Sequence, residues 1–318
     1  MKLTGLVAMM LAAFMTSSAA AAQPEASLAP GAHNEVVNGV RLSYSVKGRG
    51  KGTPLVFLHG GPGQGSQSFA MIAGRGLEQH FRIIYLDQRG SGRSERPWDD
   101  AYSVNMLVDD LDKLRQKWGV PKIDLIGHSV GTIVEMEYAA KYPSHVRRMV
   151  LAASGPDLGA AFDVMCERVR KTDPAAYQRA RAAIESGSRR SCNMWGKGVF
   201  ASGGMQRFVD GNMFPNPAIK EMINKADNAN GLRNTGELSQ ALIRQGLLDY
   251  KFAHPEKLTM PVLVIAGDRD LQAAIEPQRE FVLKLPHGRL SEWSNAGHFM
   301  WAEDPARFTD EVTTFLSQ

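Results

Sequence analysis

The residue best placed for nucleophilic chemistry is a serine between glycines, in Gly-His-Ser-Val-Gly at 127–131. The apolar, β-branched stretch 122–126 predicts a buried strand before it, and 132–142 predicts a helix after it. A serine on a tight strand-to-helix turn has a strained backbone with positive φ, which lifts its hydroxyl out of the sheet. The N-terminus of the helix favours the negative charge that develops there. We therefore predict that Ser129 is a nucleophile.

A serine nucleophile needs a general base, and the base needs a carboxylate that orients it. His298 follows the last predicted strand, and Asp270 follows the strand before that one. The carboxyl ends of parallel strands meet at one edge of a sheet, so all three side chains are expected there. We prefer Asp270 as the acid because a carboxylate three residues beyond Gly267 can reach around the loop towards the histidine. Two weaker candidates for the acid are Asp268 and Asp157.

Backbone N–H groups must stabilise the oxyanion that forms when a serine attacks a carbonyl. One is expected from Val130, directly after the serine. The other is expected from Gly61, in His-Gly-Gly-Pro-Gly at 59–63, because its glycines let the main chain approach a substrate closely. We assign His59 a structural role, in which hydrogen bonds tie this loop down, and His128 a packing role.

A second glycine-rich loop reads Asp-Gln-Arg-Gly-Ser-Gly-Arg-Ser at 87–94. Its charged residues are Asp87, Arg89 and Arg93. We predict that pairing between these aspartate and arginine side chains holds the loop shut. A binding cluster for a charged ligand is the alternative.

Metal and phosphate motifs are missing from the sequence. The eight histidines are scattered, and neither Cys-x-x-Cys nor His-Glu-x-x-His occurs. No glycine-rich loop ends in Lys-Ser or Lys-Thr. The chemistry expected of the serine requires no cofactor.

The segments between the motifs alternate between strand and helix patterns. Residues 36–46 alternate around the Asn-Gly pair at 38–39, which predicts a hairpin. Further strands are predicted at 55–58, 81–86, 122–126, 146–152, 261–266 and 288–293. Helices are predicted at 103–118, 132–142, 275–284 and 304–316. This alternation is typical of an α/β fold with a mostly parallel, doubly wound sheet and helices on both faces.

A helical block interrupts the alternation. Residues 155–252 are charged, contain methionines and are broken by proline and glycine, without a strand pattern. We predict a helical cap at 155–252, inserted into an α/β core formed by 23–154 and 253–318. The cap contains both cysteines, Cys166 and Cys192. One disulfide between them would contribute about 3–4 kcal/mol, and two unpaired buried thiols are the alternative.

The N-terminal residues 1–22 have the pattern of a secretory signal peptide. Lys2 supplies a positive charge, an uncharged apolar stretch follows, and small residues precede Gln23. The apolar part is too short to span a bilayer, and no later segment is long and apolar enough to do so. We expect an exported protein, periplasmic or secreted, that begins near Gln23.

Composition and charge limit the kinds of molecule that the protein is expected to bind. The 318 residues are 43% hydrophobic, enough for one large domain with an insertion. The net charge of +4 comes from interspersed basic and acidic residues, and no run of Lys or Arg exceeds two. This distribution does not indicate a nucleic-acid partner. We expect a small-molecule or short-peptide substrate.

Together, the motifs are similar to those of the α/β-hydrolases and, more narrowly, resemble the proline iminopeptidase family of serine peptidases. The motifs that carry the resemblance lie at 59–63, 87–94, 127–131, 267–270 and 297–299. The resemblance implies an α/β-hydrolase fold with a cap, and hydrolysis of an ester or amide bond through an acyl-enzyme. Epoxide hydrolases and haloalkane dehalogenases of this fold have aspartate in the place of Ser129.

The substrate class stays open at the level of sequence. Positions 128 and 130 are His and Val, where the iminopeptidase family usually has Gly and Trp. That family uses acidic cap residues, often after a Trp, to hold the free amino group of the substrate, but here Trp195 is followed by Gly196. Cap residues such as Trp195 are candidates for substrate binding. The three hypotheses are a proline iminopeptidase-type aminopeptidase, a carboxylesterase or lactonase, and a non-catalytic binding protein on the same fold.

Overall fold

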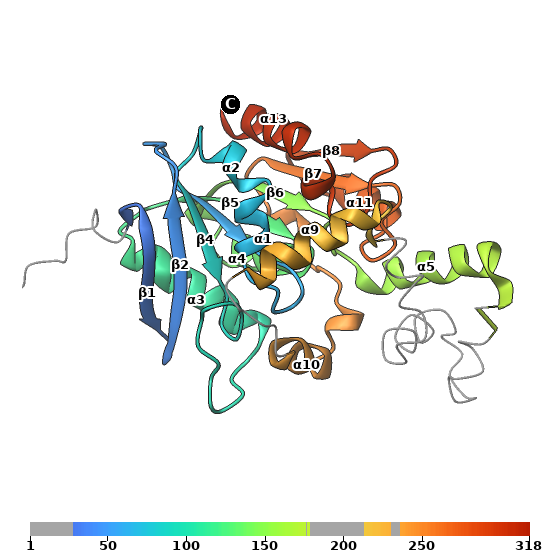
Figure 1. Ribbon diagram of the computed structural model, residues 1–318, viewed down its shortest axis with the longest axis horizontal. Coiled ribbons are helices and arrows are strands. Elements are labelled where there is room, and N and C mark those ends of the chain that lie inside the picture. Colours follow the sequence, from blue (N-terminus) through green and yellow to red (C-terminus); the bar gives the residue numbers. More distant parts are fainter. Residues whose placement is uncertain (1–27, 176, 179–212, 230–235) are drawn as a thin grey trace, which may run out of the picture.

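The computed structural model describes residues 28–175, 177–178, 213–229 and 236–318. Within this part of the chain, eight strands form one sheet in the order β1-β2-β4-β3-β5-β6-β7-β8 (Figure 1). The pairs β1–β2 and β2–β4 are antiparallel, and all the other neighbours are parallel. The strands are Gly31–Val37 (β1), Val40–Lys47 (β2), Leu55–Leu58 (β3), Ile83–Asp87 (β4), Ile123–His128 (β5), Val146–Ala152 (β6), Val262–Gly267 (β7) and Gly288–Trp293 (β8). The mostly parallel sheet predicted from the sequence is confirmed.

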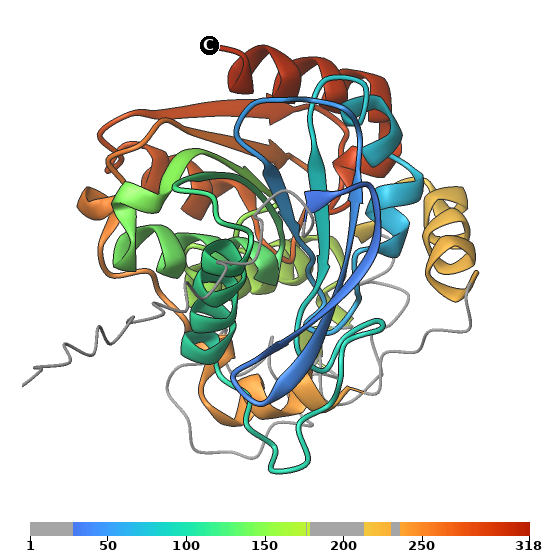
Figure 2. The same ribbon diagram turned by 90° about the vertical axis from the view of Figure 1, so that its left-hand side faces the viewer.

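Side chains of the central strands alternate between two apolar cores, one on each face of the sheet. In β3, Val56 and Leu58 join one core, whereas Leu55 and Phe57 join the other. Successive side chains of a strand point to opposite faces, so a strand covered on both faces is a continuous apolar run. The predicted helices on both faces are confirmed, as α13 and α3 lie on opposite sides of the sheet (Figures 1 and 2).

The helices that cover the first core are α3 (Val104–Lys117), α4 (Val130–Lys141) and α11 (Ile275–Val282). Those that cover the second are α1 (Gln67–Met71), α2 (Gly74–Leu77), α12 (Met300–Glu303) and α13 (Pro305–Leu316). The apolar stripe predicted for the helix at 103–118 is buried in α3, and its members are Leu107, Val108, Leu111, Leu114 and Trp118. The sequence did not predict α1, α2 and α12, because four or five residues are too few to show a helical period.

The hairpin at one edge of the sheet has the turn predicted for it. Asn38 and Gly39 connect β1 to β2 with φ values of 47° and 77°. Positive φ at both central residues is the mark of a type I′ turn, whose twist matches that of the flanking strands. Asparagine followed by glycine tolerates this backbone best, and the prediction is confirmed.

The segment between β6 and β7 is helical where the structure describes it. It contains α5 (Leu158–Thr172), α9 (Pro217–Asn228), α10 (Glu237–Arg244) and η3 (Leu247–Asp249). α9 packs against α1, and Asp227 accepts hydrogen bonds from the N–H of Ser68 and from Nε2 of Gln64, each at 3.2 Å. Cys166 is buried in α5, whereas Cys192 and Trp195 lie outside the described residues. The disulfide therefore stays a prediction.

The predicted signal peptide, at 1–22, also lies outside the described residues. In the part of the chain that the structure covers, no helix is both long enough and apolar enough to cross a membrane.

Arg89 anchors the 87–94 loop to α3. Its Nε donates to Oδ2 of Asp110 at 2.6 Å and its Nη2 donates to Oδ1 at 2.7 Å, with both side chains buried. Asp87 instead accepts the backbone N–H of Arg93 at 3.0 Å and that of Ser66 at 2.8 Å. The predicted pairing within the loop is therefore wrong. A buried guanidinium needs a carboxylate with two available oxygens, which Asp110 offers and Asp87 does not.

Glu135 is a fully buried carboxyl group on α4, directly behind the serine turn. Within the described residues, neither of its carboxyl oxygens has a hydrogen bond of good geometry, although the backbone groups of Gly127 and Val150 act on the carboxyl group. A Cβ at position 127 would lie 2.3 Å from Oε2, so Gly127 leaves just enough room for this side chain. Burial raises the pKa of the Glu135 carboxyl well above its ordinary value of 4.5. The neutral, protonated form of the group is therefore favoured in the folded protein.

The raised pKa of Glu135 predicts a pH-dependent gain in stability for Glu135→Gln. Above about pH 4.5 the unfolded chain releases the proton and the folded chain keeps it, so wild-type stability falls as pH rises. Glutamine has no such proton. The free energy of unfolding of the variant minus that of the wild type should therefore rise by about 1.4 kcal/mol for each pH unit. Urea unfolding at several pH values between about 5 and about 8 measures the difference.

The matched control is Glu280→Gln, which removes the same charge from an exposed position on α11. Its difference from the wild type should vary little with pH. A Glu135→Gln difference that is constant across the pH range would contradict the buried, protonated state.

Candidate active site

Ser129 lies on the turn between β5 and α4, with φ 53° and ψ −124°. A positive φ is strained for any residue other than glycine and persists only where the surroundings enforce it. The packing around the turn is tight, since a Cβ at Gly131 would lie 2.1 Å from the carbonyl oxygen of Leu58. The strained turn expected from the sequence is present at the end of a fully buried strand.

His298 and Asp270 are hydrogen-bonded to each other. Nδ1 of His298 donates to Oδ2 of Asp270 at 2.8 Å, and both side chains are buried. The other carboxylate oxygen, Oδ1, accepts the N–H of Gln272 at 2.8 Å and that of Ala273 at 3.2 Å. The carboxylate thus orients the imidazole and leaves Nε2 as its second nitrogen for a further partner.

These contacts keep Asp270 charged. Burial alone would raise the pKa of Asp270, but the charge and hydrogen bond of His298 act in the opposite direction. Together with the N–H groups of Ala273 and Gln272, they hold the pKa of this carboxyl below its ordinary value of 3.8. A carboxylate at this position stabilises an imidazolium when the histidine accepts a proton.

The two other candidate acids have different partners. Asp268 accepts the backbone N–H of Asn295 at 2.7 Å. Asp157 caps α5 by accepting the N–H of Ala160 at 2.9 Å, and its carboxylate also pairs with Lys251. Within the described residues, neither of them bonds to the histidine, so Asp270 is the candidate acid that the structure pairs with His298.

Ser129 and His298 line the same cavity, of about 110 Å³. Gly61 and Val130, the two residues predicted to stabilise an oxyanion, line it as well. The structure therefore brings the serine, the histidine and both backbone segments to one place. The rest of the lining in the described chain is mostly apolar, with Pro62, Ile133, Ala153, Gly155, Leu158, Phe162, Ile243, Leu247, Leu248 and Ala273 beside the polar Ser239 and Gln272.

The lining residues contributed by the cap were not predicted from the sequence. Phe162 projects from α5 and Ile243 from α10, on helices whose amphipathic patterns resemble those of any packed surface helix. Trp195, the cap residue that the sequence suggested, lies outside the described residues. A helical period indicates that one face is buried, but it does not indicate whether that face meets a core or a substrate.

The loop at 59–63, termed the oxyanion loop after the role predicted for Gly61, is held close to the serine by hydrogen bonds of His59. Its Nε2 accepts the N–H of Gln88 at 3.1 Å, so Nδ1 carries the hydrogen and donates to the carbonyl oxygen of Gly60 at 2.9 Å. Burial lowers the pKa of His59, consistent with a neutral ring. The structural role predicted for His59 is confirmed. A Cβ at Gly60 would lie 2.8 Å from Cβ of Ser129, so the approach of the loop requires glycine there.

Two further acceptors hold the loop that carries the histidine. The N–H of His298 donates to the carbonyl oxygen of Met213 at 3.1 Å, which connects the loop to the segment between β6 and β7. The N–H of Gly297 donates to Oε1 of Glu303 at 2.9 Å. The main chain on the N-terminal side of the imidazole is therefore fixed from two directions.

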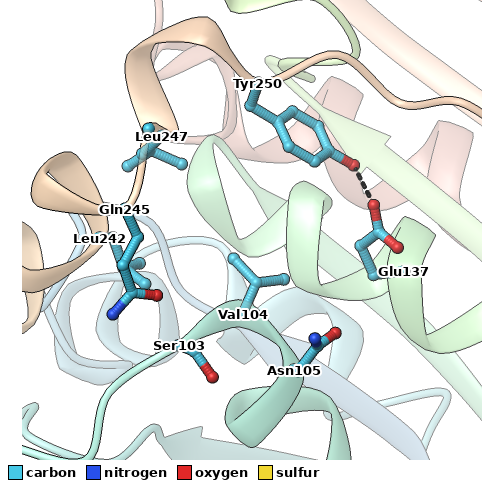
Figure 3. A pocket seen from close by; sticks show the side chains of 9 residues that line it. Ser103, Val104, Asn105, Glu137, Leu242, Gln245, Leu247 and Tyr250 are labelled. Atoms are coloured by element: carbon cyan, nitrogen blue, oxygen red, sulfur yellow. Dashed lines mark hydrogen bonds between the residues drawn. The ribbon is translucent and has the colours of Figure 1, made fainter.

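A second, larger cavity of about 260 Å³ lies between α3, α4 and the chain after α10 (Figure 3). Its polar lining includes Asn105, Gln245 and Glu137, and Oε1 of Glu137 accepts a hydrogen bond from the hydroxyl of Tyr250 at 2.9 Å. Its lining includes none of the predicted catalytic residues, and Leu247 is the side chain that it shares with the serine cavity. Size alone does not make a site, and of these two cavities the one at Ser129 is lined by both the candidate nucleophile and the candidate base.

Comparison with known proteins agrees with the fold. Residues 53–305 match the alpha/beta hydrolase fold family. A proline iminopeptidase from Heyndrickxia coagulans is 33% identical over 291 residues, 88% of this chain and 96% of that protein. The structure of a proline iminopeptidase-related protein from Thermus thermophilus is similar with a TM-score of 0.74 at 24% identity, over 90% of this chain and 96% of that one. An esterase from Rhodococcus is similar with a TM-score of 0.65 at 24% identity, over 91% and 99% of the two chains. The chain belongs to the α/β-hydrolase fold family.

Proposed function

We propose that this protein is a serine hydrolase that cleaves an ester or amide bond of a small substrate through an acyl-enzyme. The observation that carries the proposal is that Ser129 and His298 line one cavity and that His298 is hydrogen-bonded to the buried Asp270. A nucleophile, a base and an orienting carboxylate are the parts that acyl transfer requires.

In the proposed mechanism, Oγ of Ser129 attacks the carbonyl carbon of the substrate while Nε2 of His298 takes the hydroxyl proton. The N–H groups of Val130 and Gly61 stabilise the tetrahedral oxyanion. His298 then gives the proton to the leaving alcohol or amine, and the acyl group stays on Ser129. Water, activated by the same imidazole, releases the acid and restores the serine. Asp270 keeps the ring in the correct tautomer and stabilises its charged form.

For the substrate, our first candidate is a peptide or amide of the proline iminopeptidase type. Support comes from the proline iminopeptidase relative at 33% identity, which covers most of both chains. A carboxylesterase or lactonase is the second candidate. The described lining of the serine cavity favours it, since no carboxylate is present there to hold a free amino group.

A fluorophosphonate probe tests the nucleophile. We expect the wild type to gain one adduct, mapped by peptide mass spectrometry to Ser129, and we expect Ser129→Ala to gain none because no activated hydroxyl remains. Ser239→Ala is the matched control, since it removes another hydroxyl from the same cavity and should leave the adduct on Ser129. A wild type that is never labelled, or is labelled elsewhere, would contradict the proposal.

In a parallel assay, proline p-nitroanilide, short-chain p-nitrophenyl esters and acyl lactones separate the two substrate candidates. Turnover of the anilide supports the aminopeptidase. Turnover of esters or lactones without turnover of the anilide would exclude the aminopeptidase activity and support the carboxylesterase or lactonase.

Asp270→Asn should lower kcat by about 10³- to 10⁴-fold, because an amide can hold the imidazole in the wrong tautomer and cannot stabilise its charge. Asp268→Asn is the matched control, as this neighbouring side chain bonds to a backbone N–H and an amide oxygen can still accept that bond. Steady-state kinetics on the best substrate compares the two variants. A large loss for Asp268→Asn with little for Asp270→Asn would reverse our assignment of the acid.

We also propose that the protein is exported and that its signal is removed after Ala22, from the pattern at 1–22. N-terminal sequencing of the protein recovered outside the inner membrane should begin near Gln23. Ala22→Phe should block the cleavage, because signal removal requires a small residue before the cut. An intact Met1 on protein confined to the cytoplasm would refute export.

A further inference from the structure

His128, the residue directly before the nucleophile, is a buried histidine to which the mechanism above gives no role. It ends β5, and the residue is 2% exposed. Its Nε2 lies 2.9 Å from the carbonyl oxygen of His298. The side chain next to Ser129 in sequence therefore contacts the main chain of the histidine that would serve as the base.

The hydrogen bond to the carbonyl oxygen of His298 determines which nitrogen of the His128 ring carries a hydrogen. A carbonyl oxygen only accepts, so Nε2 of His128 carries a hydrogen and donates it. Burial, and after it the charge of His298, lowers the pKa of His128 to about 3, so the ring is neutral at ordinary pH. Nδ1 is then without a hydrogen, and it faces the oxyanion loop, where a Cβ at Gly60 would lie 3.2 Å from it.

Aromatic neighbours hold the ring in place. Its centroid lies 4.9 Å from that of Phe299, 5.7 Å from that of Trp301 and 5.0 Å from that of His298. A side chain packed on several sides loses its rotamer freedom and keeps a single direction for its hydrogen bond. The ring is therefore a rigid connection between the turn of the nucleophile and the loop of the base.

We propose that His128 is a positioning residue for proton transfer, whose rigid, neutral side chain holds the His298 loop at a set distance from Ser129. The inference rests on the proposed function, since it presumes that His298 takes the proton of Ser129. It extends that function by assigning the residue before the nucleophile a role in catalysis, through the main chain of His298 and not through contact with the substrate.

The other anchors of the loop do not provide this connection. Met213 holds the N–H of His298 from the cap side, and Glu303 holds the N–H of Gly297 from α12. Among the described contacts, the bond from His128 is the one that starts at the strand of the nucleophile. Small errors in the placement of reacting groups cost on the order of 10²-fold in rate, so the loss of this connection should affect kcat.

Neutrality is part of the proposed role. The titratable groups around His128 are His298, Asp270 and His59, and a proton on His128 would repel the imidazolium that forms at His298. A neutral ring donates its hydrogen bond without opposing that charge.

Two substitutions separate the hydrogen bond from packing. His128→Phe keeps an aromatic ring among Phe299 and Trp301 but has no donor, and we expect it to lower kcat by about 10- to 100-fold with KM within about 2-fold. His128→Gln retains an N–H near the position of Nε2 and should keep kcat within about 5-fold of the wild type. If packing alone mattered, the order of the two variants would be reversed, and that order would overturn the proposal.

The matched control is His33→Phe. His33 lies on the edge strand β1, and its Nε2 also bonds to a backbone carbonyl oxygen, that of Ala29, at 2.7 Å. This change removes the same kind of bond at a remote position and should leave kcat within about 2-fold of the wild type.

The rate of fluorophosphonate labelling separates failure of this inference from failure of the proposed function. If the wild type is not labelled, the serine hydrolase assignment itself fails. If the wild type is labelled and His128→Phe is labelled at the same rate, the hydrolase assignment survives and the positioning role fails.

NMR of the wild-type protein tests the inference without any variant, should His128→Phe fail to fold. The ¹⁵N shifts of His128 should show hydrogen on Nε2 and not on Nδ1, with no titration between about pH 5 and about pH 8. Hydrogen on Nδ1, or protonation of the ring within this range, would overturn the proposal.

Discussion

The strained turn at Ser129 is the constraint on which the rest of the site depends. A positive φ at a serine costs on the order of 1–3 kcal/mol and persists only where the fold enforces it. Here the fully buried strand β5 leads into α4, and glycines at 60, 127 and 131 let neighbouring main chain and side chains come within contact distance. A methyl group at any of the three would push away the oxyanion loop, Glu135 or β3. The sheet thus supplies the stability that offsets the strain and places a hydroxyl at its edge.

Burial then divides the ionisable groups around this turn into charged and neutral ones. Asp270 remains a carboxylate because an imidazole and two backbone N–H groups satisfy its oxygens. At Glu135, burial outweighs the backbone groups of Gly127 and Val150 and raises the pKa of the carboxyl group, while His59 and His128 are neutral because burial lowers their pKa. A fixed negative charge therefore lies beside the ring of His298, while the other two buried histidines around the turn are neutral.

Local patterns in the sequence were sufficient to predict where the strands lie along the chain, that helices cover both faces of the sheet, and that the serine lies on a tight turn. Continuous apolar runs indicated doubly covered strands, and glycines around Ser129 indicated a tight turn. Contacts between side chains that are far apart in the sequence could not be predicted from these local patterns. Arg89 pairs with Asp110 of α3 and not within its own loop, and Phe162 lines the cavity from a helix with an ordinary amphipathic pattern. His128, expected only to pack, donates a hydrogen bond to His298.

The most direct test of the central claim is a crystal structure of the protein after reaction with a fluorophosphonate. Our account predicts phosphorus bonded to Oγ of Ser129, its free oxygen about 2.7–3.1 Å from the backbone nitrogens of Val130 and Gly61, and Nε2 of His298 within hydrogen-bonding distance of the adduct. An adduct on a different residue, or an imidazole that lies beyond contact with the serine oxygen, would contradict it.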